Sequence, residues 1–476
     1  MNALRTLRDR QWPSGATVFG VGTAVVYLLA LAYMMGHTSF DVWGGMVIAP
    51  VLLVMTIPLA ISAGRADNDR WTTQIVITAF LLKTVGALVR YYVTFSLYGS
   101  GDADGYNSAG AQLATLFRQG NFSFDIGKKI AGTGFIEIVT GFVYTITGAT
   151  KLGGFFVYSW FGFVGLFFFY RAFRIGFPEG DHKRYALLVF FLPSLLFWPS
   201  SIGKESWMML TLGIASYGAA RMLTAHQFGV PVFALGLLGT AMVRPHVSLI
   251  AIVSLFGAYL LRKSPRPSLL GPAVKILMLA ILAVGTLAVM SQMESFFGVS
   301  KIDGTSADQI LTTANKQSTQ GGSAVATAAS PSNPVAVANA IVAVIFRPWP
   351  YEAHNLQSLA ASMEGVLLLG LLLTSLRRIA AIPRAMVRRP YVAFALMYSL
   401  LFAYAFSSIG NFGILSRERV QLYPLLVLLI CIPVGFGREP EEIESDTDPA
   451  GDEAGDRVGG NARVTSHPFP SRVGSP

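Results

Sequence analysis

The stretch from Thr73 to Tyr106, TQIVITAFLLKTVGALVRYYVTFSLYGSGDADGY, joins a long apolar run to a polar segment that contains two carboxylates. About 20 apolar residues are enough to cross the roughly 30 Å hydrocarbon core of a bilayer. The first part of the stretch, 73–97, therefore predicts a membrane-spanning helix. Asp102 and Asp104 then fall at the edge of the membrane, where carboxylates form either a solvated turn or a reactive site.

Similar apolar runs recur from Thr17 to Phe436, and the composition agrees with them. The chain of 476 residues is 53% hydrophobic and 13% charged, with a mean hydropathy of +0.53. Its net charge is +10, but the lysines and arginines cluster in short loops between apolar runs, which indicates membrane topology and no nucleic-acid partner. The single cysteine, Cys431, excludes an intrachain disulfide. The sequence has no phosphate-binding loop, dinucleotide fingerprint or His/Cys metal motif, which argues against ATP-driven transport and redox chemistry.

We expect an all-α polytopic membrane protein with about twelve transmembrane helices, together with re-entrant or interfacial helices. The predicted spans are about 17–35, 44–63, 73–97, 153–170, 185–199, 205–224, 229–243, 245–262, 272–290, 361–376, 391–408 and 420–436. Two further apolar stretches, about 132–149 and 335–347, are ambiguous. The protein is then one transmembrane domain, 1–436, with outer loops near 98–131 and 291–360, followed by a disordered acidic cytoplasmic tail over 437–476.

The two ambiguous stretches decide which loops face the cytoplasm. If both cross the membrane, several basic clusters fall outside: Arg171, Arg174, Lys183, Arg184, Arg221, Arg262, Lys263 and Arg266. If both stay in the outer leaflet, all of these clusters are cytoplasmic. Positive charge is enriched in cytoplasmic loops, so the second topology is preferred, with both termini in the cytoplasm. It places Asp102, Asp104 and most other unusual polar residues on the outer face.

Asp102-Ala103-Asp104-Gly105-Tyr106 is the first candidate site. Transfer of a sugar to a hydroxyl needs a carboxylate that accepts the hydroxyl proton, and a second carboxylate can orient the acceptor or hold a metal. The alternative interpretation is a turn, for which Asp and Gly are well suited. A divalent cation such as Mg²⁺ or Mn²⁺ is compatible with this pair, but no metal ligands are assigned.

Cationic residues near the outer ends of helices form a candidate phosphate site. A proline-broken segment, Pro193 to Glu205, presents free backbone N–H groups and Lys204, with Glu205 beside it. Arg244-Pro245-His246 joins two short spans tightly, so Arg244 needs an anionic partner, and His246 could relay a proton. The alternatives are a snorkelling lysine and a structural histidine.

A third group combines a cation, aromatic rings and an acid between the predicted outer loop and the next span. Such residues suit the faces and hydroxyls of sugars, and they suit an interfacial aromatic belt equally well. The candidate acceptor and sugar contacts are Arg347, Trp349, Tyr351, Glu352 and His354, together with Glu205 and His246. Near the last span, Arg417 and Arg419 could hold a phosphate bidentately, or pair with Glu418 between them.

The chain resembles the GT-C superfamily of glycosyltransferases, which use sugars linked to polyprenyl phosphate. In that family an outer loop carries an acidic pair, with an aromatic residue four positions after the first acid, as Asp102 and Tyr106 are here. Residues 109–117 resemble the amphipathic helix that follows, and 132–148 the interfacial segment. The resemblance implies Asp102 as catalytic base, Asp104 as secondary acid and Tyr106 as a positioning group. An Arg-rich start to a late helix, followed by a Pro-Leu-Leu run, implies that Arg417 and Arg419 bind the lipid phosphate.

Two features depart from the family pattern. The second acid lies two residues after the first instead of directly following it, and two additional helices precede the span that enters the loop. The Pro193–Glu205 stretch is also similar to segments of bacterial polysaccharide-assembly membrane proteins.

These patterns predict an inverting glycosyltransferase of the bacterial cytoplasmic membrane with its active site facing outside. It would move a sugar from a polyprenyl-phosphate-type carrier to a glycan, lipid or protein of the cell envelope. One alternative is an O-antigen-type polysaccharide polymerase or ligase, which depends on arginines. Another is a non-enzymatic flippase or transporter of lipid-linked sugars, whose charges would line a path through the bilayer.

Overall fold

The computed structural model describes residues 15–122, 127, 129–262, 334–407, 409 and 411–437. The chain divides into two units, Met1–Phe436 and Gly437–Pro476, and nearly all described residues belong to the first. The predicted span 272–290, residues 291–333 of the predicted loop 291–360, and the predicted tail beyond Gly437 lie outside the described residues.

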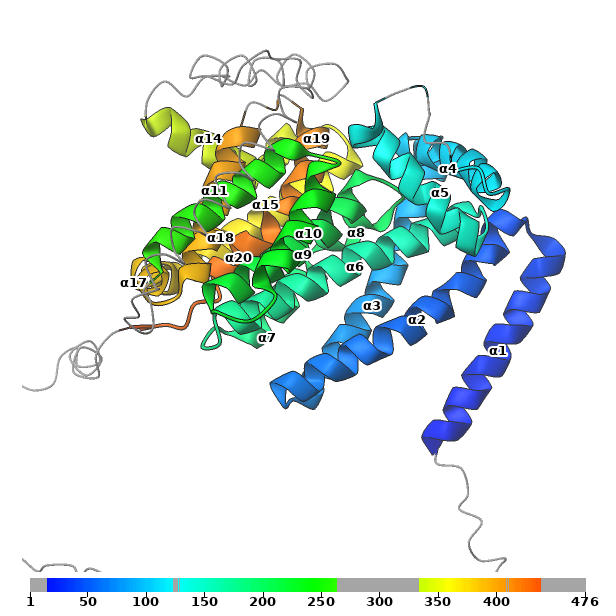
Figure 1. Cartoon of the computed structure of the whole chain (residues 1–476), viewed down its shortest axis with the longest axis horizontal. Coiled ribbons are helices and arrows are strands. Elements are labelled where there is room, and N and C mark those ends of the chain that lie inside the picture. The colour runs from blue at the N-terminus through cyan, green and yellow to red at the C-terminus, as the bar shows by residue number, and fades with distance from the viewer. Residues whose placement is uncertain are drawn as a thin grey trace, which may run out of the picture. The chain divides into compact units, whose positions relative to one another are not determined.

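The described residues form helices and no strand, as the apolar runs predict (Figure 1). The longer helices are α1 (Gly15–His37), α2 (Phe40–Asp67), α3 (Arg70–Tyr92), α4 (Asp102–Arg118), α5 (Phe135–Thr147), α6 (Lys151–Gly176), α7 (His182–Phe191), α9 (Lys204–Leu223), α10 (Gly229–Ala241), α11 (Pro245–Leu261), α14 (Pro334–Phe346), α15 (Leu356–Leu373) and α18 (Pro390–Phe406). Short helices are η1 (Val93–Leu97), η2 (Ile130–Gly134), α8 (Pro193–Phe197), η3 (Trp198–Ser200), η4 (Pro350–Glu352), α16 (Leu376–Ile379), α17 (Ile382–Arg388), α19 (Phe412–Glu418), η5 (Arg419–Gln421) and α20 (Tyr423–Leu429).

Six segments in the described part of the chain are long and apolar enough to cross a membrane. They are Gly20–His37, Phe40–Asp67, Arg70–Leu97, Ile130–Thr147, Lys151–Gly176 and Leu356–Leu373, and a pair bent by 118°, Leu376–Arg388 and Pro390–Phe406, gives a seventh if it is one span. The protein is thus an α-helical membrane protein, and twelve spans remain a prediction.

Two predicted spans are not single straight helices, and prolines explain the first of them. The predicted span 185–199 is α7, α8 and η3 in succession, because Pro193 and Pro199 cannot donate the backbone hydrogen bonds of a continuous helix. The predicted span 420–436 is reduced to η5 and α20, after which the chain continues in turns to Gly437.

The ambiguous stretch 132–149 also contains a break. Ala131 and Gly132 have non-helical backbone angles, and the φ of +87° at Gly132 is one that glycine adopts readily. The uninterrupted helix α5 therefore has 13 residues and is about 20 Å long. Helix α5 alone is shorter than the roughly 30 Å of hydrocarbon, whereas the whole segment Ile130–Thr147 is long and apolar enough to cross, so its interfacial placement stays a prediction.

Helix α6 is the buried centre of the fold. Small residues let it approach α9 closely: a Cβ added at Gly165 would lie 2.2 Å from the carbonyl oxygen of Met209, and one at Gly213 would lie 2.2 Å from that of Gly165. Helix α10 packs on the next face of α9 through Gly218 and Gly236. Close packing through small residues is the usual way in which membrane helices associate.

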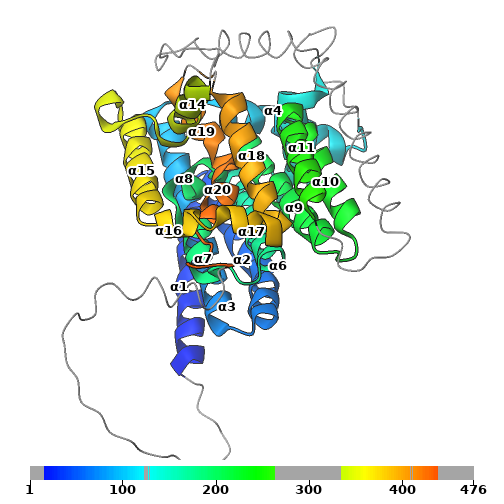
Figure 2. The same cartoon turned by 90° about the vertical axis from the view of Figure 1, so that its left-hand side faces the viewer.

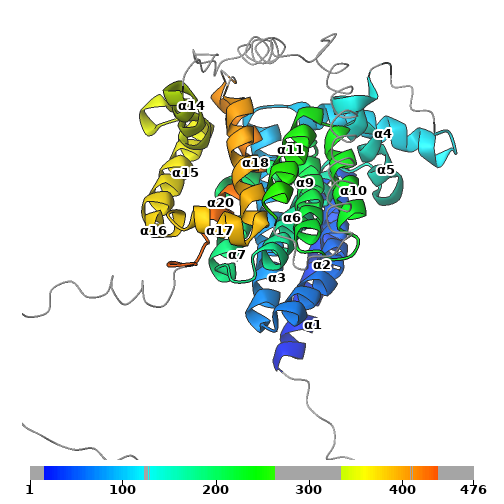
Figure 3. The same ribbon diagram turned by 60° about the vertical axis from the view of Figure 1, so that its left-hand side comes forward.

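The C-terminal helices α14 to α20 pack beside α11, α7 and α8 and complete the unit. Helix α18 packs along α11, and α20 lies between α18 and α7 (Figure 3). Helix α15 contacts α8, α14 and α19 (Figure 2). This arrangement brings α19 close to the starts of α4 and α9, although those elements are separated by about 200 to 300 residues of sequence.

Candidate functional site

A cavity of about 340 Å³ lies where the end of α3, the start of α4, the start of α9 and α19 approach one another. The side chains that line it combine three cations, two carboxylates and three aromatic side chains. Its main lining residues are Arg90, Thr94, Tyr98, Asp102, Tyr106, Trp198, Lys204, Glu205, Gln357, Asn411 and Arg417.

Asp102 occupies the first turn of α4 and faces this cavity. The residue before it, Gly101, has extended backbone angles, so α4 starts at Asp102. The Asp102 side chain is 66% exposed, and one of its carboxylate oxygens, Oδ2, lies 3.0 Å from Nη1 of Arg417. A carboxylate at a helix N-terminus is favoured by the helix dipole. Asp102 is therefore both anchored and accessible.

Asp104 lies on a different face of the same turn. Its carboxylate is 3.1 Å from Nζ of Lys151, at the start of α6, and it does not line the cavity. Two residues correspond to about 200° of rotation around a helix, which separates the two acids. The structure thus brings Asp102 but not Asp104 to the cavity.

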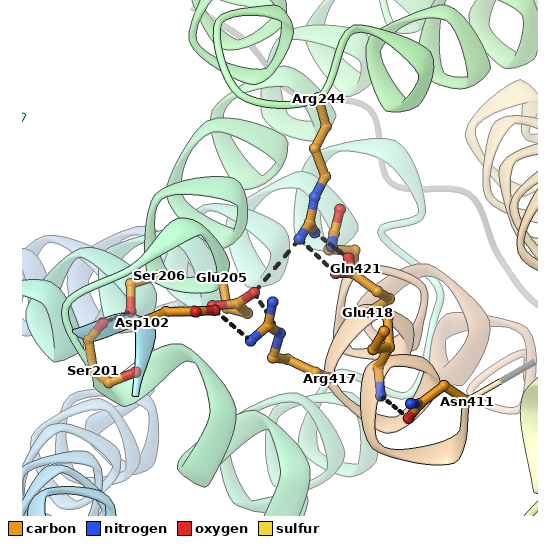
Figure 4. A network of polar contacts seen from close by, with 10 residues as sticks. Asp102, Ser201, Glu205, Ser206, Arg244, Asn411, Arg417, Glu418 and Gln421 are labelled. Carbon is orange, nitrogen blue, oxygen red and sulfur yellow. Dashed lines mark hydrogen bonds and ion pairs between the residues drawn. The ribbon is translucent and has the colours of Figure 1, made fainter. Parts of the chain in front are cut away.

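A chain of alternating charges extends from Asp102 into the protein (Figure 4). Arg417 Nε lies 3.0 Å from Oε1 of Glu205, and the same oxygen lies 3.5 Å from Nη2 of Arg244. Arg244 also pairs with Glu418, to which Gln421 donates a hydrogen bond of 2.8 Å. These contacts connect four elements, α4, α19, α9 and η5, with the residue before α11. They hold the wall of the cavity together.

The orientation of Arg417 depends on a short capped helix. Asn411 accepts hydrogen bonds from the backbone N–H groups of Gly413 and Ile414, at 2.9 and 3.2 Å, and so begins α19. Glu205 is the main cause that raises the pKa of Arg417, with Glu418 and Asp102 adding to it. Arg417 is thus a permanent cation held between acids.

Two cations of the cavity have no such partner. Neither Arg90 nor Lys204 forms an ion pair with an acid in the part of the chain that the structure describes, and Arg90 Nε has no hydrogen-bond partner there. The Arg90 guanidinium lies 4.8 Å from the ring centre of Phe197 and 4.7 Å from that of Trp198. Cation–π contacts hold its position without neutralising its charge.

Tyr106 lines the cavity and is 5% exposed. Burial is the main cause that raises the pKa of its hydroxyl, with Glu205 and Asp102 adding to it. The side chain is therefore a neutral phenol at physiological pH, able to donate and accept one hydrogen bond each.

Arg419 lies outside the cavity and is completely buried. Its guanidinium donates to the backbone carbonyl groups of Arg347 (2.7 Å), Ala361 (3.1 Å) and Ile345 (3.5 Å). These bonds tie the end of α14 and the start of α15 to η5. Arg244, likewise, is occupied by Glu205 and Glu418 and does not line the cavity.

The remaining predicted contacts lie apart from the cavity. The ring of His246 packs against Phe406, with ring centres 5.7 Å apart. Arg347 and Glu352 pair with each other, which lowers the pKa of the Glu352 carboxyl. Trp349, Tyr351 and His354 flank this pair and, like it, do not line the cavity.

Sequence reasoning missed several residues of the cavity, namely Arg90, Thr94, Tyr98, Gln357 and Asn411, and gave no role to Trp198 within the candidate segment Pro193 to Glu205. Arg90 had a usable signal, because an arginine inside an apolar run is costly and needs a reason. Asn411 and Gln357 have no such signal, since they are common polar residues in connections.

Within the described residues, no group of three or more His, Cys, Asp or Glu side chains is arranged to hold a metal ion. A scan against protein-family models and searches of curated proteins and of solved structures find no match to this chain.

Proposed function

We propose that this protein is a membrane glycosyltransferase that takes a sugar from a polyprenyl-phosphate-type carrier. The acceptor is a hydroxyl group of a glycan, lipid or protein of the cell envelope. The proposal places the protein in the cytoplasmic membrane of a bacterium, with the cavity on the outer face. It also keeps the resemblance to the GT-C superfamily as its fold hypothesis.

The observation that carries the proposal is the set of side chains that line the cavity between α3, α4, α9 and α19. One accessible carboxylate, Asp102, shares a space of about 340 Å³ with two cations, Arg90 and Lys204, that form no ion pair with a described acid. A base beside a phosphate-binding group is what transfer from a sugar phosphate to a hydroxyl requires.

In the proposed reaction the acceptor hydroxyl attacks the anomeric carbon of the sugar, and the bond from that carbon to the phosphate oxygen breaks. Asp102 accepts the hydroxyl proton, and the carrier phosphate leaves with the bonding electron pair. Lys204 and Arg90 stabilise the negative charge that develops on the phosphate. A single displacement inverts the configuration at the anomeric carbon.

The charged chain behind the cavity has a positioning role in this proposal. Arg417 orients the Asp102 carboxylate, and Glu205, Arg244 and Glu418 hold Arg417 in place. Tyr106, as a neutral phenol, can donate a hydrogen bond to a sugar or phosphate oxygen. Arg419 receives a structural role, because three carbonyl groups occupy its donors.

The test compares Asp102→Asn with wild type in a deletion strain at matched membrane levels, by mass spectrometry of lipid-linked and envelope glycans. General base catalysis contributes about 10²- to 10⁴-fold, so Asp102→Asn should leave one sugar unadded while its lipid-linked donor accumulates. Asp104→Asn is the matched control, because Asp104 has the same chemistry in the same helical turn but does not line the cavity.

Normal glycans in the Asp102→Asn strain would refute the base assignment. The abundance of cations over acids in the cavity would then favour an O-antigen-type polymerase or ligase, in which Arg90→Gln or Arg417→Gln blocks glycan assembly while Asp102→Asn does not.

A further inference from the structure

A second cavity, of about 490 Å³, lies next to the first between α3, α8 and α15. Its walls are mostly aliphatic and aromatic side chains, among them Val89, Val93, Leu97, Phe197, Leu356 and Ala360. We call it the apolar groove. Several apolar residues of its wall are exposed at the surface: Val89 is 48%, Leu97 56% and Leu356 75% exposed.

The apolar groove and the polar cavity share part of their walls. Tyr98, Trp198 and Gln357 line both, and the Tyr98 hydroxyl donates a hydrogen bond of 3.1 Å to Oε1 of Gln357 at this border. The two spaces are thus neighbours, one with charges and one with hydrocarbon side chains.

Glu364 is the one acid among the described residues of the groove wall, and hydrogen bonds hold its carboxylate against the break before α8. Glu364 is 3% exposed, and its carboxylate accepts hydrogen bonds from the backbone N–H of Ser194, at 2.8 Å, and from the Ser194 hydroxyl. These bonds join α15 to the break before α8. They direct the acid toward the protein and leave the apolar side chains to form the surface of the groove.

Arg90 lies at the junction, because its guanidinium is stacked against Phe197 and Trp198, which line the groove. Together with Lys204 it provides two positive charges that form no ion pair with a described acid. Both side chains are partly buried, and a partly desolvated cation without an ion-pair partner is a place where a ligand anion would be stabilised.

We propose that Arg90 and Lys204 bind the phosphate of a polyprenyl-type lipid, whose hydrocarbon chain lies in the apolar groove between α3, α8 and α15. The choice of this lipid rests on the proposed function. The groove is formed largely by two helices long enough to cross a membrane, α3 and α15, so a lipid can enter it sideways from the bilayer.

The test is native mass spectrometry of the purified full-length protein in detergent, titrated with undecaprenyl phosphate. Undecaprenol supplies the chain without the charge, and inorganic phosphate supplies the charge without the chain. Phosphatidylglycerol, as a competitor, distinguishes a polyprenyl lipid from any anionic membrane lipid. None of these measurements requires sugar transfer.

We expect undecaprenyl phosphate to bind at least about tenfold more tightly than undecaprenol, as one charge-assisted hydrogen bond would give. Arg90→Gln and Lys204→Gln should each remove about that factor for the phosphate and leave undecaprenol binding unchanged. Arg90→Lys should recover part of it. Ala360→Trp, which fills the groove, should weaken both lipids.

Two controls match these variants. Lys151→Gln removes a cation near the start of α4 that does not line either cavity. Met363→Trp adds the same bulk to α15 at an exposed position outside the groove. Both should bind undecaprenyl phosphate as wild type does, and thermal unfolding in detergent should show that all variants are folded.

Equal binding of undecaprenol and undecaprenyl phosphate, equal competition by phosphatidylglycerol, or unchanged binding in Arg90→Gln would each overturn the inference. Inorganic phosphate binding as tightly as the lipid would refute the role of the groove. If undecaprenyl phosphate does not bind while glycan assembly still depends on Asp102, this inference alone is wrong. If undecaprenyl phosphate binds as expected while Asp102→Asn leaves the glycans normal, the proposed function alone is wrong.

Discussion

Asp67 and Asp102 flank the continuous helical segment formed by α3 and η1, yet the protein surrounds them very differently. Asp67 is the last residue of α2, just before α3, and Asp102 follows η1. The segment between them is about 40 Å long. The Asp67 side chain is 3% exposed and accepts hydrogen bonds from Tyr170 (2.6 Å), Arg174 (3.0 Å) and Thr72 (3.2 Å).

Asp102, by contrast, is 66% exposed and contacts one arginine at the edge of a cavity. A buried acid whose oxygens are all engaged joins helices, whereas an acid with a free approach can react. The comparison suggests two criteria that separate structural acids from functional ones better than residue type does. They are the burial of the carboxylate and whether all of its oxygens accept hydrogen bonds or ion pairs. The buried pair of Arg244 and Glu418, at the inner end of the charged chain, resembles Asp67 in being structural.

Arg244→Met should give the largest loss of stability, because it leaves Glu418 buried without a cation. Removing one partner of a buried ion pair costs about 3–5 kcal/mol. Thermal or denaturant unfolding in detergent measures this cost. The double variant Arg244→Met with Glu418→Gln should recover part of it, and a single variant within about 0.5 kcal/mol of wild type would show that the pair is not structural.

Asp67→Asn should cost less, about 2–3 kcal/mol, since Arg171 and Arg174 are each 20% exposed and can reach water once their acid is gone. Binding of undecaprenyl phosphate should not change. A loss of lipid binding at unchanged stability would contradict the assignment of this end of the protein as purely structural.

Lys204 should make the binding of lipid phosphate depend on pH, which is the smallest of the three effects. Burial is the main cause that lowers the pKa of its amine, and the neighbouring Arg244 adds to it. The positive charge is present below that pKa and is lost as pH rises through it. The affinity should therefore fall on the alkaline side, starting at a lower pH than for an ordinary lysine.

Lys204→Arg tests this cause directly, because arginine stays charged throughout the range. The affinity of wild type for the lipid phosphate should fall by less than about tenfold over this pH interval. The affinity of Lys204→Arg should stay constant over the same interval. Identical pH profiles for the two proteins would exclude Lys204 as the titrating group.

The sequence predicted the helical membrane fold, because long apolar runs leave few alternatives in a bilayer. It also placed Asp102, Lys204, Glu205 and Arg417 on one face, and the structure brings these four residues to one cavity. What it could not supply was the pairing between distant elements. Asp102 and Arg417 are 315 positions apart, and their contact depends on how α4 and α19 pack.

The same limit explains Arg244 and Arg419. Both have the chemistry of phosphate ligands, and only the fold shows that Arg244 pairs with protein carboxylates and that the terminal nitrogens of Arg419 donate to backbone carbonyls. Arg90 was missed although an arginine in an apolar run is itself a signal, and only the fold shows that its guanidinium stacks on the rings of Phe197 and Trp198 at the cavity.

The three cations and two acids of the polar cavity also set an electrical balance for the proposed reaction. With Arg90, Lys204 and Arg417 charged and Asp102 and Glu205 ionised, the cavity carries one excess positive charge, which matches the single negative charge of a sugar-phosphate diester. When Asp102 takes the acceptor proton, the excess rises to two, as the departing monoester phosphate approaches two negative charges. Reactant and product complexes are then each neutral, so the proton that Asp102 gains compensates the charge that the leaving group acquires.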